Sequence, residues 1–136
     1  MFSAIEVPFG CVMLFNAVNL KPGVTVEDVE LALGEMCNVV KNTYGNEEGG
    51  FIGGQVYQYA GFISEEGSVG KTPEEKGTAR INPGEVAIVT YWKSFEQHEK
   101  SHADAAFKEK FSALSEYCED TWELGYEMLW QGTPED

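Results

Sequence analysis

The two histidines of the sequence, His98 and His102, are its clearest candidates for chemistry. They lie four residues apart, in a segment typical of the end of a strand and the first turns of a helix. Side chains at positions i and i+4 of a helix lie on one face, one above the other. Two imidazoles and one carboxylate are a ligand set typical of non-haem iron(II). The spacing therefore indicates a metal site, and two histidines on a solvent-facing helix surface are the alternative.

The hydrophobic pattern predicts the scaffold that must hold these histidines. Helical spacing predicts one helix from Thr25, its cap, to about Asn42, and a second from Ser94 to about Cys118. Apolar runs predict strands over 11–20, 51–60, 86–92 and 122–130, with a long polar excursion over 64–84. The order β-α-β-β-α-β predicts a single α+β domain over 1–136, ferredoxin-like, with a four-stranded antiparallel sheet.

One face of the predicted sheet has no helix to cover it, because both helices belong on the other face. That face still carries apolar side chains, including Tyr, Trp and Met. A second copy of the chain would bury them. We therefore expect a homodimer, or a higher homo-oligomer, packed sheet against sheet as a dimeric α/β barrel.

Composition excludes several classes of partner. The chain has 136 residues, 43% of them hydrophobic, and a formal net charge of −14. This charge argues against nucleic acid and anionic membrane surfaces as partners. Glu6 and Pro8 interrupt the first apolar run, which predicts neither a signal peptide nor a membrane span. The three widely spaced cysteines, Cys11, Cys37 and Cys118, predict reduced thiols in a cytoplasmic protein.

The second predicted helix contains a conflict of phase. At about 100° per residue, His98 and His102 fall opposite the apolar stripe of Phe107, Phe111 and Leu114. In one straight helix the stripe would face the core and the histidines would face water. A bend near residues 103–106 would turn both sets inward. Periodicity leaves both possibilities open.

Several short motifs, taken together, resemble the first ferredoxin-like half of the sulfur oxygenase reductases. The likeness covers roughly residues 12–130, and the spacing from Trp92 to His98 is the same. The shared motifs are Cys37-Asn38-Val39, Gly50-Phe51-Ile52-Gly53, Tyr91-Trp92-Lys93, His98-Glu99-Lys100-Ser101-His102, Cys118 and Tyr126-Glu127. Those enzymes have two fused halves, so two copies of this chain would form the equivalent unit.

The resemblance implies a metal-dependent oxidoreductase acting on inorganic sulfur or on a small thiol or persulfide. It implies a mononuclear non-haem iron bound by His98 and His102, and a sulfur-carrying catalytic cysteine at Cys37. The third ligand that it favours is Glu127, with Glu123 as the alternative. Both carboxylates point to the same side of a strand, because an even number of residues separates them.

A wider resemblance extends to single-domain dimeric α/β-barrel proteins, including antibiotic-biosynthesis-type monooxygenases and haem-degrading enzymes. Trp92-Lys93-Ser94, followed by His98 or His102, fits their pattern. This likeness implies a cofactor-free or haem-binding monooxygenase as an alternative function. Asn19 matches the assisting asparagine of the haem-degrading members, although an Asn at a strand end also suits a turn. A third alternative is a dimeric sulfur-carrier or binding protein without turnover.

Overall fold

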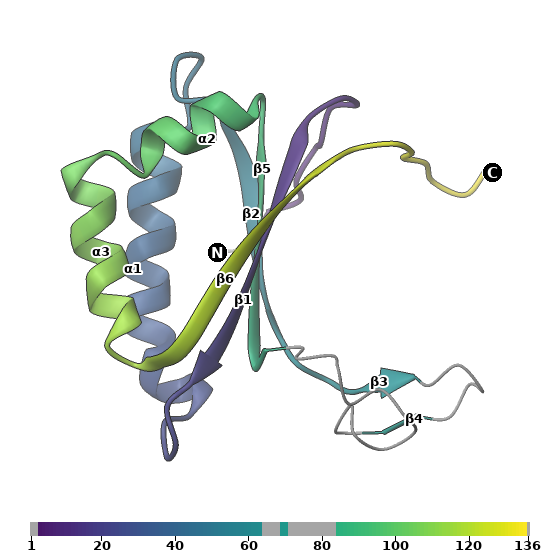
Figure 1. Cartoon of the computed structure of the whole chain (residues 1–136). Helices are drawn as coiled ribbons and strands as arrows, with labels where there is room; N and C mark the ends of the chain where they lie inside the picture. The colour runs from purple at the N-terminus through teal and green to yellow at the C-terminus, as the bar shows by residue number, and fades with distance from the viewer. Residues whose placement is uncertain (1–2, 64–68, 71–83, 136) are drawn as a thin grey trace.

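The computed structural model describes residues 3–63, 69–70 and 84–135, and in these residues three helices lie on one face of a four-stranded sheet (Figure 1). The elements in chain order are β1 (Val12–Leu20), α1 (Val26–Tyr44), β2 (Phe51–Gln58), β3 (Phe62–Ile63), β4 (Val69–Gly70), β5 (Val86–Trp92), α2 (Phe95–Ser101), α3 (Ala105–Ser115) and β6 (Cys118–Glu127). This confirms the ferredoxin-like α+β fold. The predicted excursion over 64–84 lies, apart from β4 and Gly84, outside the described residues.

The sheet has the order β2-β5-β1-β6, so the first strand lies in the interior of the sheet. β1 pairs antiparallel with β5 on one side and with β6 on the other. The last strand begins earlier than the sequence predicted, because Cys118 already pairs with Leu20. Since Cys118 belongs to that strand, the prediction that the second helix extends to it is wrong, and α3 ends at Ser115.

The core lies between the sheet and α1. A capping box starts this helix, in which the Asp28 backbone N–H donates to Thr25 Oγ1 and the Thr25 N–H donates to the Asp28 carboxylate. The apolar stripe then faces the sheet, so that Val29 is fully buried and Leu14 of β1 is 1% exposed. The sheet face over which α1 lies is therefore the one where a site can be enclosed.

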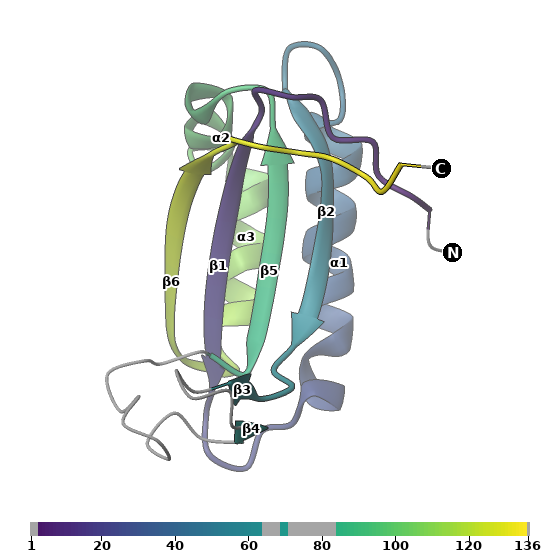
Figure 2. The same cartoon turned by 90° about the vertical axis from the view of Figure 1, so that its right-hand side faces the viewer.

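The opposite face of the sheet carries no helix (Figure 2). Strand alternation places Tyr57, Leu124 and Tyr126 there, and their residues are between 45% and 52% exposed. The prediction of an uncovered apolar sheet face is confirmed for this single chain.

The second helical segment breaks where the sequence allowed a bend. α2 ends with His102 as its C-cap, and Asp104 caps α3 by accepting a hydrogen bond from the Ala106 N–H. The two helices therefore have independent phases. His98 is buried, and Leu114 of α3 is buried as well. The straight-helix alternative is wrong, and the reason is the capped break at 102–104.

Among the helices that the structure describes, none has the length and apolarity needed to cross a membrane.

Candidate metal centre

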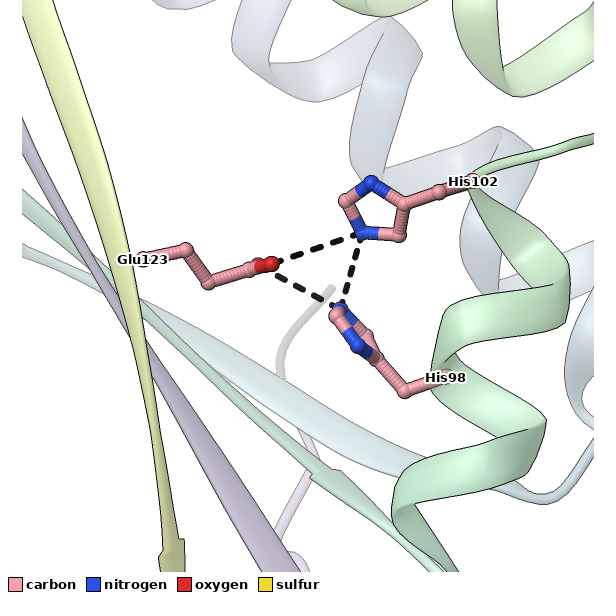
Figure 3. Close-up of side chains that lie close together, drawn as sticks. All are labelled: His98, His102 and Glu123. Carbon is pink, nitrogen blue, oxygen red and sulfur yellow. Dashed lines mark hydrogen bonds and ion pairs between the residues drawn. The ribbon is translucent and has the colours of Figure 1, made fainter.

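Three side chains meet between α2 and β6, namely His98, His102 and Glu123 (Figure 3). The two Nε2 atoms of the histidines are 2.9 Å apart. Glu123 Oε2 lies 3.3 Å from His98 Nε2, and its Oε1 lies 3.5 Å from His102 Nε2. Each histidine thus directs its Nε2 toward the Glu123 carboxylate, and one ligand atom from each residue lies within 4.8 Å of the others.

This triangle has the size that a single metal ion requires. Ligand atoms about 2.1 Å from one ion, at angles between octahedral and tetrahedral, lie about 3.0–3.4 Å from each other. The nitrogen–nitrogen separation of 2.9 Å lies close to that range, and so do the separations of 3.3 and 3.5 Å from the two nitrogens to the two oxygens of Glu123. The donor set is two imidazoles and one carboxylate, which suits iron(II) and zinc. The cluster therefore fits a mononuclear site without large rearrangement.

Local contacts hold α2 in place above the sheet. Ser94 caps the helix by accepting from the Gln97 N–H, and the Gln97 amide donates to the backbone oxygens of residues 47 and 48. The Trp92 ring lies edge-on to the His98 ring, with centroids 5.2 Å apart. Tyr44 of α1 donates its hydroxyl to the Ser101 carbonyl. The backbone that presents both histidines is thus fixed from three directions.

The structure brings Glu123, and not Glu127, to the histidines. Glu123 lies opposite Asn16 in the pairing of β6 with β1, whereas Glu127 lies opposite Val12. Four residues of strand separate the two carboxylates by about 14 Å. Of the two sequence alternatives for the third ligand, the geometry favours Glu123. The face shared by the two residues was predicted correctly, but their distance from the histidines depends on the tertiary fold.

Burial and hydrogen bonding set the charges of the cluster. Burial by itself raises the pKa of Glu123, but hydrogen bonds from His98 and Asn16 and the charges of both histidines lower this pKa below its usual value. Burial lowers the pKa of His102, and the nearby Glu123 charge offsets only part of that effect. An ionised carboxylate therefore faces a neutral His102 imidazole at neutral pH, and both of these forms bind cations.

The other ring nitrogen of His98 has a different environment. His98 is only 5% exposed, and its Nδ1 has no hydrogen-bond partner among the described residues. If Nε2 gave its lone pair to a metal, the ring proton would lie on Nδ1. An unpaired buried N–H costs about 1–3 kcal/mol. Nδ1 is unpaired in the other tautomer too, where it is a buried acceptor, but only that tautomer leaves an N–H on Nε2, 3.3 Å from the Glu123 carboxylate.

A cavity of about 50 Å³ adjoins the cluster, between the sheet and the helices. His98, His102, Glu123 and Asn16 form its polar end. The remaining wall is mostly apolar and includes Val18, Met36, Ile88, Phe111, Leu114 and Cys118. Asn16 was not identified from the sequence, although a polar residue between Leu14 and Val18 on a buried strand face was a usable signal.

The two cysteines considered from the sequence lie in different places. Cys37 is partly buried on α1 and is not among the residues that line the cavity. Burial raises the pKa of its thiol, which disfavours the reactive thiolate. Cys118 does line the cavity, and its thiol donates to the Leu114 carbonyl at 3.4 Å. The sulfur-carrying role of Cys37 stays a prediction.

Known structures share the fold at low sequence identity. SnoaB, a cofactor-independent oxygenase from Streptomyces nogalater, is 11% identical with a TM-score of 0.61, covering 93% of this chain and 99% of that chain. A hydroxynitrile lyase from Passiflora edulis is 10% identical with a TM-score of 0.62, covering 93% and 100%. A dimeric protein of unknown function and ferredoxin-like fold from Bacteroides fragilis is 12% identical with a TM-score of 0.55, covering 92% and 100%. No protein-family model and no curated protein matches the sequence.

These likenesses show the ferredoxin-like fold alone. They carry no information on sulfur chemistry or on a metal. One of the three is an oxygenase and another is a lyase, so the fold alone does not select a reaction. Function must be argued from the cluster and the cavity.

Proposed function

We propose that the chain is a small-molecule oxidoreductase of the oxygenase type, with a mononuclear iron(II) held by His98, His102 and Glu123. The observation that carries the proposal is that two histidine Nε2 atoms 2.9 Å apart face a carboxylate whose two oxygens lie 3.3 and 3.5 Å from them, separations close to those of ligands around one ion. Two histidines and one carboxylate on one side of a metal leave positions open for oxygen and substrate.

The residues of the chain have separate tasks in this proposal. Bound iron would supply the binding and activation of dioxygen. Glu123 contributes the negative charge that retains the cation, and Asn16 orients its carboxylate by a hydrogen bond. His102 offers a neutral nitrogen because burial lowers its pKa. The apolar wall formed by residues such as Ile88 and Leu114 keeps water away from the reacting molecule.

The finer proposal, that the substrate is inorganic sulfur or a small thiol or persulfide carried by Cys37, rests on the sequence resemblance. The position of Cys37 outside the cavity wall gives it no additional support. A persulfide on Cys37 would appear as a mass increase of one sulfur atom in the intact protein after incubation with a sulfur donor. The same mass in a Cys37→Ser variant would exclude Cys37 as the carrier.

A cofactor-independent oxygenase is the second candidate, and two observations favour it. With the ring proton on Nε2, His98 has an N–H within reach of His102 and Glu123, and its buried Nδ1 does not have to carry an unpaired N–H. SnoaB, with the same fold, is such an oxygenase. In this case the neutral His102 acts as the general base that removes a proton from the substrate. Haem binding through one of the histidines remains the third possibility from the sequence.

We further propose that two copies pair through the uncovered sheet face. The outward side chains over most of the three adjacent strands are uncharged, namely Met13, Phe15, Ala17, Ala87, Val89, Tyr91, Trp122, Leu124 and Tyr126. Asn19 and the charged Asp120 lie together at one end of this face. A chain with a net charge of −14 repels its copies everywhere else. The Bacteroides fragilis protein of this fold is dimeric, which supports the proposal.

Metal analysis tests the first candidate against the second. The purified full chain, supplied with iron(II) without oxygen, is expected to bind about one iron per chain. Glu123→Gln should weaken iron binding by at least about 100-fold, since even residues that only support a ligand change metal affinity by about 10–100-fold. Glu127→Gln is the matched control and should bind as the parent does.

Three outcomes would separate the candidates. Absence of any first-row metal after iron supplementation would exclude the metal centre. Oxygen consumption by chelator-treated protein, lost in His102→Ala, would support the cofactor-independent reaction. A Soret shift on adding haem that is lost in a His98→Ala, His102→Ala double variant would support haem ligation.

A further inference from the structure

The cavity beside the cluster is narrow and extends along α3. Phe107, Phe111, Leu114 and Ser115 line it from this helix. The eight steps along the helix from Phe107 to Ser115 span about 12 Å at about 1.5 Å per residue. Its volume is about 50 Å³, while one water molecule needs about 10–15 Å³ on the same scale. A space of this length and volume suits a thin, unbranched chain.

The charges of the cavity are as informative as its shape. No lysine or arginine is among the lining residues, all of which belong to the described chain, and Glu123 is the one acidic residue there. Its carboxylate lies at the polar end of the cavity, 3.3 Å from His98 Nε2 and 3.5 Å from His102 Nε2. In the metal-free protein, an anionic ligand would face this charge without a compensating cation. A cationic ligand would have to lose its hydration beside a carboxylate that already has hydrogen-bond partners.

We propose that this cavity binds a short, uncharged, straight-chain organic molecule such as an alcohol. Its polar end meets His98, His102 and Glu123, and its hydrocarbon chain extends between α3 and β6 toward Ser115 and Cys118. This inference rests on the proposed function in one respect, which is that the reaction takes place at His98, His102 and Glu123. It names the class of substrate that the apolar lining of the cavity selects, and in the metal-free protein it disfavours anions.

A chain-length series tests the proposal. The probes are straight-chain alcohols from ethanol to decanol, titrated into the full chain and followed by NMR shifts of the lining residues, both after chelator treatment and after adding iron(II). Each methylene that enters the cavity should tighten binding about fourfold, since burial of one CH₂ contributes about 0.8 kcal/mol. The gain should stop within the series, where the cavity is full. Affinity that does not depend on chain length would overturn the proposal.

Head-group probes test the charge argument in the chelator-treated protein. Hexanol should bind at least about tenfold more tightly than hexanoate, because Glu123 repels the carboxylate. It should also bind more tightly than hexylammonium, because the ammonium must be desolvated. Tighter binding of either ion would contradict the uncharged class.

A matched pair of variants tests where the hydrocarbon chain of the alcohol lies in the cavity. Ser115 lines the cavity and is half-buried, whereas Ser112, one turn earlier, is exposed and does not line it. Ser115→Leu should weaken binding of the longest alcohols at least about tenfold by filling the far end, while ethanol binding stays unchanged. Ser112→Leu should leave the whole series unchanged. Circular dichroism of both variants confirms that each is folded.

These results separate this inference from the proposed function. Chain-length dependence in the chelator-treated protein supports the cavity even if no iron binds. If the cluster binds iron, but alcohols bind equally well to Ser115→Leu and to the parent, the proposed metal centre stands. The proposed substrate class is then wrong.

Discussion

The two helical segments that cover the sheet are built differently. α1 is one uninterrupted helix of 19 residues with a capping box at its start, and it buries five side chains. The second segment is divided into α2, of 7 residues, and α3, of 11 residues. Among its residues, α3 fully buries only Leu114, while α2 buries His98 and Ser101. One segment is therefore held by apolar packing along its length, and the other is held at a few points.

This difference explains where the site lies. A continuous helix can turn only one face toward the sheet, and in α1 that face is filled with apolar side chains. The break at 102–104 gives the second segment two independent faces. α2 turns its histidines toward Glu123, and α3 turns Leu114 into the core. Stability is thus concentrated in α1, and the candidate chemistry in the segment that is attached less firmly.

The largest effect on the free energy of unfolding should come from truncating Leu114, the one fully buried side chain of α3. Leu114→Ala is expected to lower the free energy of unfolding by about 2–5 kcal/mol, because it leaves a cavity under a helix with no other fully buried residue. Leu31→Ala, on the exposed side of α1, is the control and should change it by less than about 0.5 kcal/mol. Urea unfolding measures both. Equal effects of the two substitutions would show that α3 is not held by Leu114.

A smaller loss of stability is expected from removing a helix cap, either Thr25 of α1 or Asp104 of α3. Thr25→Ala and Asp104→Ala each remove a side chain that accepts from a backbone N–H at a helix start. Each should cost about 0.5–2 kcal/mol of stability. Only Asp104→Ala should also weaken iron(II) binding, by about tenfold, because it loosens the break that orients His102. If Thr25→Ala weakened iron binding equally, the break would have no special role in positioning the site.

The smallest expected effect is on the pH dependence of stability. The pKa of His102 is lowered from 6.5 by burial, so below that pH the unfolded chain binds a proton that the folded chain does not. Stability should therefore fall as the pH decreases from 6.5 toward the folded-state pKa. The lowered pKa of Glu123 adds a second loss below 4.5, again because the unfolded state takes up the proton first.

Urea unfolding between about pH 7.5 and about pH 5 measures the first of these losses. His102→Gln removes the titrating group and should flatten the curve in this range. If the free energy of unfolding falls with decreasing pH as steeply in His102→Gln as in the parent, other groups cause the acid destabilisation.

Much of the fold could be predicted from the sequence, because it depends on local patterns. Apolar periodicity and cap residues located α1 and β5 to within a few residues. The last strand was placed less well, since its start at Cys118 depends on pairing with Leu20 of a distant strand. For the candidate site, the sequence placed the histidine pair on one helix face and favoured Glu127 over Glu123, whereas the structure brings Glu123 to the histidines.

The sequence by itself determined that His98 and His102 share one helix face, and that Glu123 and Glu127 share one strand face, because these relations follow from the repeats of helix and strand. Only the tertiary structure decided that the helix breaks after His102, that Glu123 is the carboxylate opposite it, and that Cys37 lies outside the cavity. The physical reason is that each of these depends on how far apart separate elements lie. Those distances are set by strand register and by the packing of helices on the sheet, which no local repeat contains.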